Sequence, residues 1–326
     1  MRTDEVEEVA LKWNRISLGL IAAVAATPHR LPATEGAMGR PITGMQITPY
    51  VGVIPNTPGL QFSMSYVHYD GEIGASREAP IAGREAFNLS ADMDLLAATF
   101  AYIWDTGEGR WNFASMLTIP VISLDVAADL QVGNLQARTK DSSSGLFDLY
   151  FAPVIASYHV SEVEHWSMGV YVYAPTADYD KDNLANNGLN IWTISPAVGY
   201  TRLFEEGSLE LSVLAGVDFS TKNDGTDYQS GALFRLDALL IQSTRSGWGF
   251  GAVAGWIEQI EDDSGPTADR LDGFRGRSLG IGPVLSYSKH WSKEGGVFLT
   301  LRWLKEFDVK NRLDGDPLML NVSLTF

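Results

Sequence analysis

The chain has 326 residues, no cysteine and a formal net charge of -16 at pH 7. These values exclude a disulfide framework and a thiolate metal site, and they argue against nucleic-acid binding, because phosphate contacts require a basic surface. The mean hydropathy of -0.03 is too polar for a helical membrane protein, but it suits a barrel whose strands face lipid on one side and a polar lumen on the other.

Residues 1–33 have the features of an export signal. Lys12 and Arg15 supply a basic n-region, and residues 16–26 supply an apolar stretch that is too short to cross a bilayer as a helix. Cleavage is expected after Ala26 or Ala33. The acidic residues before the basic region are unusual in a signal, so either the true start lies further downstream or this part is a short soluble tail.

Residues 34–58 are rich in proline and glycine and precede the first expected strand. We expect this segment either to remain in the periplasm or to thread into the lumen. The threading hypothesis depends on glycines that strand parity places on the inward face: Gly247, Gly249, Gly251, Gly255, Gly276, Gly280 and Gly282. Strand bending and barrel curvature are the alternative role of these glycines.

From residue 59 onward, segments of about ten to fourteen residues alternate apolar and polar side chains, as tilted membrane strands do. The pattern is clearest in residues 209–219 and recurs at 192–201, 248–256 and 297–303. The last segment, 318–326, has an apolar face and ends on Phe326. A C-terminal strand that ends in an aromatic residue resembles the signal that the barrel assembly machinery recognises.

The spacing of these segments predicts their topology. If residues 316–326 run toward the periplasm, the external connections are expected at about 70–87, 125–144, 176–189, 221–229, 259–273 and 307–315. The periplasmic connections are expected at about 105–110, 160–164, 204–208, 244–246 and 290–294. Every predicted external connection is longer than every periplasmic one, which is typical of outer-membrane barrels.

This pattern predicts an all-β fold: a transmembrane antiparallel β-barrel of twelve strands, spanning residues 59–326, in the outer membrane of a Gram-negative bacterium. Four tryptophans near strand ends favour the same fold, because such side chains anchor at membrane interfaces. They are Trp166, Trp192, Trp248 and Trp303.

Several motifs are similar to those of the "MetA-pathway of phenol degradation" family. They are Thr34-Glu35-Gly36, PNTPGL at 55–60, YDKDNLANNGLNIW at 179–192, NDGTDYQSG at 223–231 with Phe234 and Asp237, Asn311-Arg312, and the terminal strand. The resemblance covers nearly all of the mature chain. It implies an outer-membrane barrel that serves as an uptake route for aromatic or other hydrophobic compounds, with no established catalytic residue and no cofactor.

Five residues of two predicted external loops are candidates for the pore mouth: Tyr179, Asp180, Asn186, Asp227 and Tyr228. These two loops flank one hairpin, so the motifs are expected to lie close together. The residues either shape a constriction for the solute or only lock the two loops to each other, since Asn, Asp and Gly are turn-forming residues.

Strand parity places five charged residues on the lumen face: Glu210, Asp218, Arg235, Asp237 and Arg302. An arginine at the lipid-facing midplane costs about 2–4 kcal/mol, so both arginines are expected to point inward. The five could form a ladder that selects solutes. We favour the alternative that they neutralise one another, because buried charges require partners.

Arg275 and Arg277 fall on the outward face near the external end. They could contact lipopolysaccharide phosphates, or they could lie at a solvated loop base paired with Asp272. The external loops are acidic, but no metal-ligand spacing is present.

Catalysis is the less favoured interpretation. His159 and Ser161 have a spacing that a lipase could use, but they fall on a periplasmic turn without an acidic partner. The sequence therefore predicts a channel for a small apolar solute, in contact with outer-membrane lipid. The alternative is a structural or lipid-acting barrel without transport.

Overall fold

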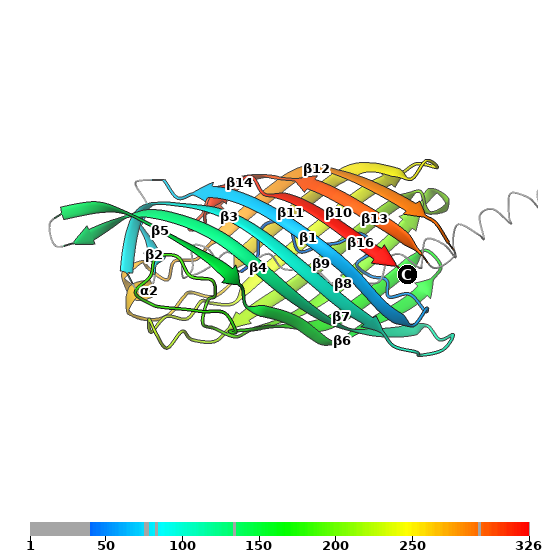
Figure 1. Cartoon of the computed structure of the whole chain (residues 1–326), viewed down its shortest axis with the longest axis horizontal. Coiled ribbons are helices and arrows are strands. Elements are labelled where there is room, and N and C mark those ends of the chain that lie inside the picture. The colour runs from blue at the N-terminus through cyan, green and yellow to red at the C-terminus, as the bar shows by residue number, and fades with distance from the viewer. Residues whose placement is uncertain (1–39, 75–77, 82–83, 133–134, 293–294, 326) are drawn as a thin grey trace, which may run out of the picture.

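The computed structural model describes residues 40–74, 78–81, 84–132, 135–292 and 295–325. Within these ranges the chain is all-β, with a 3-10 turn (η2, Glu205–Gly207) and one turn of α-helix (α2, Pro266–Arg270). None of the described helices is long and apolar enough to cross a membrane. Figure 1 shows the strands wrapped around a common axis as an elongated cylinder.

Twelve antiparallel strands form the wall of this cylinder. In order around the barrel they are β1 (Gly59–Glu72), β3 (Arg84–Ile103), β4 (Trp111–Val132), β6 (Leu149–Ser161), β7 (Glu164–Ala174), β8 (Thr193–Phe204), β9 (Leu209–Ser220), β10 (Leu233–Ser243), β11 (Trp248–Gln259), β12 (Arg277–His290), β13 (Gly296–Trp303) and β16 (Leu318–Thr325). β1 pairs with both β3 and β16, which closes the sheet on itself. The predicted twelve-stranded barrel is confirmed.

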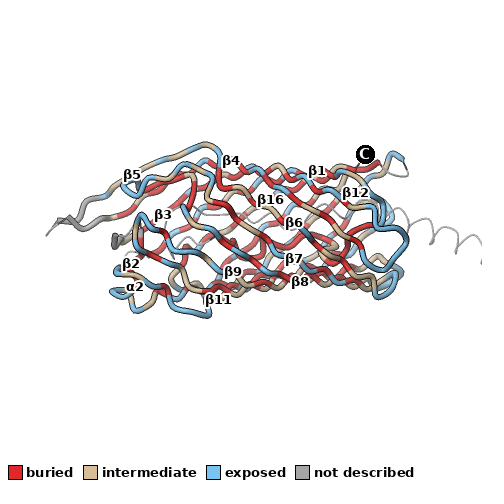
Figure 2. The backbone as a smooth tube through the Cα atoms, turned by 90° about the horizontal axis from the view of Figure 1, so that it is seen from below, coloured by how far each residue is buried: buried red, intermediate tan, exposed pale blue. Residues whose placement is uncertain are grey.

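Burial alternates along these strands with a period of two (Figure 2). In β9 and β10, every second residue is buried and its neighbours are partly exposed. The exposed set is apolar and includes Leu60, Phe250 and Ile281, each more than half exposed. Such a surface is stable only against lipid, because water would have to cover a continuous apolar belt.

The external connections differ from the prediction in two ways: two of them contain paired strands, and the last one is shorter than expected. β4 continues to Val132 and pairs with β5 (Leu135–Leu146), so most of the predicted 125–144 loop is a hairpin, and Figure 1 shows it projecting beyond the barrel. β2 (Glu78–Ile81) likewise pairs with the start of β3 within the predicted 70–87 loop.

The second difference is at the last external connection. β14 (Lys305–Lys310) continues β13 and pairs with β12, and β15 (Asp314–Gly315) precedes β16 and pairs with β1. Only residues 311–313 remain between them, fewer than in the periplasmic turn at 205–208. The prediction that every external connection is the longer one is therefore wrong here, because backbone pairing continues past the predicted strand ends.

Residues 40–55, which we call the plug segment, lie inside the barrel. Residues 40–55 belong to no helix or strand, and every residue from 40 to 49 is buried. Ile42, Met45 and Ile47 are almost fully enclosed and pack in the same apolar cluster as the inward side chains of the wall. The predicted signal (1–33) and residues 34–39 of the predicted N-terminal segment lie outside the described residues.

Candidate functional site

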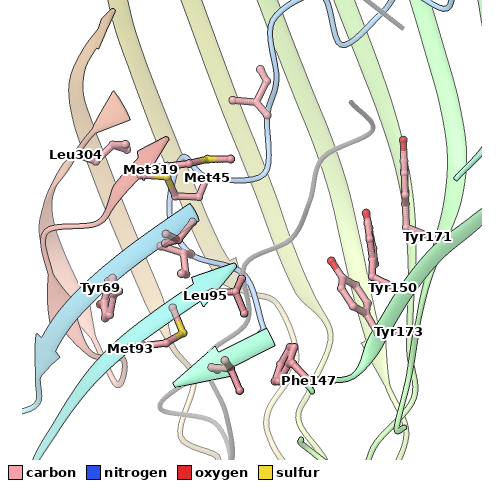
Figure 3. Close-up of a cluster of buried hydrophobic side chains, with 14 of the residues drawn as sticks. Met45, Tyr69, Met93, Leu95, Phe147, Tyr150, Tyr171, Tyr173, Leu304 and Met319 are labelled. Atoms are coloured by element: carbon pink, nitrogen blue, oxygen red, sulfur yellow. The ribbon is translucent and has the colours of Figure 1, made fainter. Parts of the chain in front are cut away.

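The lumen has one apolar side and one polar side. The apolar side is formed by inward residues of β1, β3 and β4, namely Val67, Tyr69, Leu89, Ala91, Met93, Leu95, Ile122, Leu124 and Val126. Figure 3 shows several of them around Met45 of the plug segment. On the other side, the strands from β8 to β13 direct serine, threonine and charged side chains inward, together with apolar ones such as Leu239 and Val253. The plug segment lies between these two surfaces.

Two carboxylates of the polar side bind the backbone of the plug segment. Asp237 accepts hydrogen bonds from the backbone N–H groups of Gly44 at 3.2 Å and Gln46 at 3.0 Å, one on each oxygen. Glu210 accepts one from the N–H of Tyr50 at 2.6 Å. These contacts satisfy backbone donors that an irregular buried segment cannot pair within itself.

The arginines on the polar side have different partners. Arg302 donates from Nη1 to the carbonyl oxygen of Ile47 at 2.5 Å. Arg235 instead donates from Nε to Asp218 at 3.2 Å. All five predicted lumen residues are thus buried and face inward, but only Arg235 and Asp218 pair with each other, whereas the other three bind the plug segment.

Glu306 is a sixth charged residue of the lumen that the sequence analysis missed. Its carboxylate accepts hydrogen bonds from Thr43, Ser278 (2.9 Å), Tyr69 (2.8 Å) and the Gly315 N–H (3.0 Å). Among the described strands, β14 and β15 are not paired with each other. The bond from the Gly315 N–H to Glu306 therefore links them through a side chain. Extending the parity of Arg302 by four residues would have identified it.

Gly255 of β11 allows the plug segment to approach the wall closely. A Cβ atom at this position would overlap the backbone of Gly44, which itself has a φ of +71° that favours glycine. The threading hypothesis assigns this role to the inward glycines, namely leaving room for the N-terminal segment, and Gly255 fulfils it.

The periplasmic end of the plug segment is held by β4, β6, β7 and β8. Its backbone groups bond to Asn112, Ser157, His159, Ser167 and Thr201. His159 also faces His165, with 2.7 Å between their Nδ1 atoms. Ser161 accepts a bond from the Val163 N–H, so His159 and Ser161 have separate partners.

The external mouth is covered by the loop 175–192. Asp148, fully buried, accepts hydrogen bonds from the N–H groups of Thr176, Ala177 and Leu189. Asp141 accepts two more, from Leu184 and Ala185. The loop is therefore fastened by Asp141 of β5 and by Asp148 in the β5–β6 connection.

The five predicted pore-mouth residues do not converge on one opening. Tyr179 accepts a hydrogen bond from Asn223 at 2.9 Å, and this bond joins the two loops. Asn186 accepts one from the Asp180 N–H within its own loop. Asp227 is exposed and pairs with Lys222, and Tyr228 is buried and donates to Asp263 of the next loop.

Asn223 is the residue that connects these loops, because it also accepts a bond from Asn190 at 2.9 Å. From its motif, Asn223 is expected only to form a turn. Burial raises the pKa of Asp263 to about 6, although hydrogen bonds from Tyr228, the Gly231 N–H and Gln259 act to lower it.

Arg275 and Arg277 are both exposed on the outer face of the external end. Arg275 pairs with Asp262 at 2.5 Å and Arg277 with Asp308 at 2.7 Å. The partner expected from the sequence, Asp272, pairs with neither arginine.

The sequence profile of the family described as "Putative MetA-pathway of phenol degradation" matches residues 75–322, which is most of the chain. The protein belongs to this family. None of the curated proteins compared with the sequence matches it.

A solved outer-membrane channel shares the fold of this MetA-pathway member. The crystal structure of the COG4313 outer membrane channel from Pseudomonas putida F1 has a TM-score of 0.62 at 14% identity, covering 86% of this chain and 100% of that one. A Pseudomonas aeruginosa FadL homologue has a TM-score of 0.45 at 11% identity, covering 92% of this chain and 99% of that one. This member of the MetA-pathway family is an outer-membrane β-barrel.

The MetA-pathway motifs concentrate at the external mouth. Residues 179–192 lie in the loop that covers the lumen, and residues 223–231 lie in the connection bonded to it through Asn223. The plug segment lies before the matched range.

Proposed function

We propose that this protein takes up small apolar or aromatic compounds across the outer membrane, and that the plug segment controls the lumen. The observation that carries the proposal is the division of the lumen into two sides. One side carries an apolar cluster along β1, β3 and β4, and three charged residues of the other side, Glu210, Asp237 and Arg302, are bonded to the plug segment.

A lumen of this kind favours apolar solutes over hydrophilic ones. Channels for hydrophilic solutes have a polar, water-filled interior, whereas Met93, Leu95 and Leu124 present side chains without hydrogen-bonding capacity. A sugar in contact with them would lose hydrogen bonds to water without replacement. An aromatic ring would instead bury apolar surface. The name of the family, a phenol degradation pathway, supports phenol-type compounds as the class.

Uptake by whole cells tests the proposal, because lipopolysaccharide is the barrier that a protein route would bypass. The full chain is produced in a Gram-negative host without its own aromatic channel, and uptake of labelled phenol, toluene and glucose is compared with that of host cells lacking it. We expect faster uptake of the aromatic compounds only. Variant Leu95→Asp, which places a charge on the apolar side, should reduce this uptake. Unchanged rates in all cells would favour a structural or lipid-acting barrel, and the proposal includes no catalytic step.

We further propose that the mouth residues act as a lid that must open for the solute. Tyr179 fastens the 175–192 loop to Asn223, and Tyr228 fastens the next loop to Asp263. Replacing both tyrosines with alanine should increase flux if these contacts close the mouth. Equal flux in a folded barrel would leave them only the role of locking two loops together.

Residues on the outward face of the barrel are candidates for contacts with the outer membrane and with the assembly machinery. Arg275 and Arg277 are proposed to bind lipopolysaccharide phosphates when they are released from Asp262 and Asp308, since an arginine can exchange a carboxylate for a phosphate. The apolar face of β16 supports recognition by the barrel assembly machinery. Phe326, on which that prediction depends, lies outside the described residues.

A further inference from the structure

Three tyrosines form a stack in the lumen near its external end. Tyr150 extends from β6, and Tyr171 and Tyr173 extend from β7. The ring of Tyr150 lies 5.7 Å from that of Tyr171, at an interplanar angle of 7°, and 4.4 Å from that of Tyr173. Figure 3 shows the three side chains standing side by side. They provide a buried aromatic surface below the 175–192 loop.

Two buried guanidinium groups lie beside this stack. Arg40 of the plug segment has its Cζ atom 5.1 Å from the centre of the Tyr173 ring. Arg235 of β10 interacts electrostatically with Tyr150 and Tyr173, and both arginines interact with Asp218. The exposed fractions of Arg40 and Arg235 are 4% and 2%. The cluster therefore combines π-faces with two enclosed cations.

These arginines have more donors than the structure gives them acceptors. Arg40 donates from Nη2 to the carbonyl oxygen of Ile191, but its Nε and Nη1 atoms have no hydrogen-bond partner. Arg235 bonds to Asp218 and Ser195, and its Nη1 atom has no partner. Buried donors without acceptors are rare and destabilising.

The nearby carboxylates do not supply the missing acceptors. Asp148 lies 3.7 Å from Arg40, which is too long for a hydrogen bond. Its two oxygens already accept the backbone N–H groups that fasten the 175–192 loop. Asp218 is bonded to Ser195 and to Arg235 Nε. The free guanidinium donors are thus available to an acceptor that comes from outside the chain.

We propose that this cluster binds an aromatic carboxylate, with the carboxylate on Arg40 and Arg235 and the ring on the tyrosine stack. Guanidinium groups bind carboxylates through paired hydrogen bonds, and aromatic rings gain from tilted or offset contact with tyrosine. The inference rests on the proposed uptake of aromatic solutes and adds that, within this class, the lumen binds acidic members more tightly than neutral ones. Because Arg40 belongs to the plug segment, a bound solute contacts the plug and the wall together.

Calorimetric titration of the full chain in detergent tests the proposal with three probes: benzoate, benzyl alcohol and cyclohexanecarboxylate. Benzoate should bind at least about tenfold more tightly than benzyl alcohol, because the alcohol lacks the charge. Benzoate should also bind a few-fold more tightly than cyclohexanecarboxylate, which lacks the flat ring.

Variants assign the binding to the cluster. R40Q and R235Q should each weaken benzoate binding about tenfold or more and leave benzyl alcohol little changed. Tyr173→Leu should weaken benzoate more than cyclohexanecarboxylate. Arg245→Gln, in the exposed β10–β11 turn, is the matched control and should bind benzoate as the original chain does. The shift in gel migration between unboiled and boiled samples shows that each variant is folded.

Several results would overturn the proposal. Benzoate that does not bind, that binds no better than benzyl alcohol, or that binds equally to R40Q and R235Q would mean that only water occupies the free donors. If phenol and toluene uptake persisted in that case, the proposed function would stand without this site. If benzoate bound as expected but aromatic uptake were absent, the site would stand and the transport proposal would fail.

Discussion

Asp237 is the residue whose replacement should most directly release the plug segment. Its two oxygens accept the N–H groups of Gly44 and Gln46, and the backbone there has no other side-chain acceptor among the bonds described. Asp237→Ala removes both bonds. A hydrogen bond to a charged group contributes about 1.5–3 kcal/mol, so taking the low end for each gives about 3 kcal/mol. That energy corresponds to an increase of about a hundredfold in the population of the released segment.

Amide hydrogen exchange of the purified barrel measures this release, because exchange of a buried N–H reports local opening. In Asp237→Ala, the Gly44 and Gln46 amides should exchange about a hundredfold faster, while amides of β6 and β7 keep their rates. Asp237→Asn retains one acceptor and should give a smaller effect. Asp308→Ala, an exposed carboxylate that pairs with Arg277, is the control. Unchanged exchange at residues 44 and 46 in a folded Asp237→Ala barrel would refute the assignment of Asp237 as an anchor.

Three further predictions test other parts of the structure. Gly255→Val should displace the plug segment, since its side chain would overlap the backbone of Gly44; planar-bilayer recordings should show a higher conductance, and a conductance equal to that of the original chain would contradict the close approach. The raised pKa of Asp263, about 6, means that the folded mouth favours the protonated acid. The stabilisation that the protonated Asp263 gives to the mouth should be complete below about pH 4, the pKa of an aspartic acid in the unfolded chain, and should be lost as the pH rises through 6. Exchange of the Gly231 amide should therefore be slower at pH 5 than at pH 8 after correction for intrinsic rates. Asp263→Asn should abolish that difference. Closure of β1 on β16 predicts that the unboiled protein migrates differently from the boiled one on gels in detergent, and identical migration would argue against a closed barrel.

The barrel could be predicted from the sequence because lipid and lumen impose a two-residue period on every strand that crosses the membrane. The same parity placed Glu210, Asp237 and Arg302 on the inner face. It failed beyond the membrane, in β5, where every residue from 138 to 146 is exposed or half-buried and residues such as Lys140 and Ser142 no longer alternate with apolar ones. Because β5 is polar on both faces, its sequence has the composition of a loop, and it is predicted as one.

The contacts of the plug segment could not be predicted in this way. Asp237 lies 191 residues after Gln46 in the chain, and no local pattern connects a carboxylate in β10 to a backbone N–H in an irregular segment. The mouth was difficult for a similar reason. Tyr179 and Tyr228 belong to recognisable motifs, but only the folded loops show that they bond to different partners, Asn223 and Asp263.

The position of the anchoring residues also sets the order in which the protein can assemble. The plug segment is synthesised before every strand, yet its hydrogen-bond partners come from β9, β10, β13 and β14. It cannot be seated until most of the wall exists, and β1, which directly follows it, is the strand that completes the circle with β16. The lumen can therefore be occluded only late in assembly, and a half-built intermediate has no means of keeping its own lumen shut.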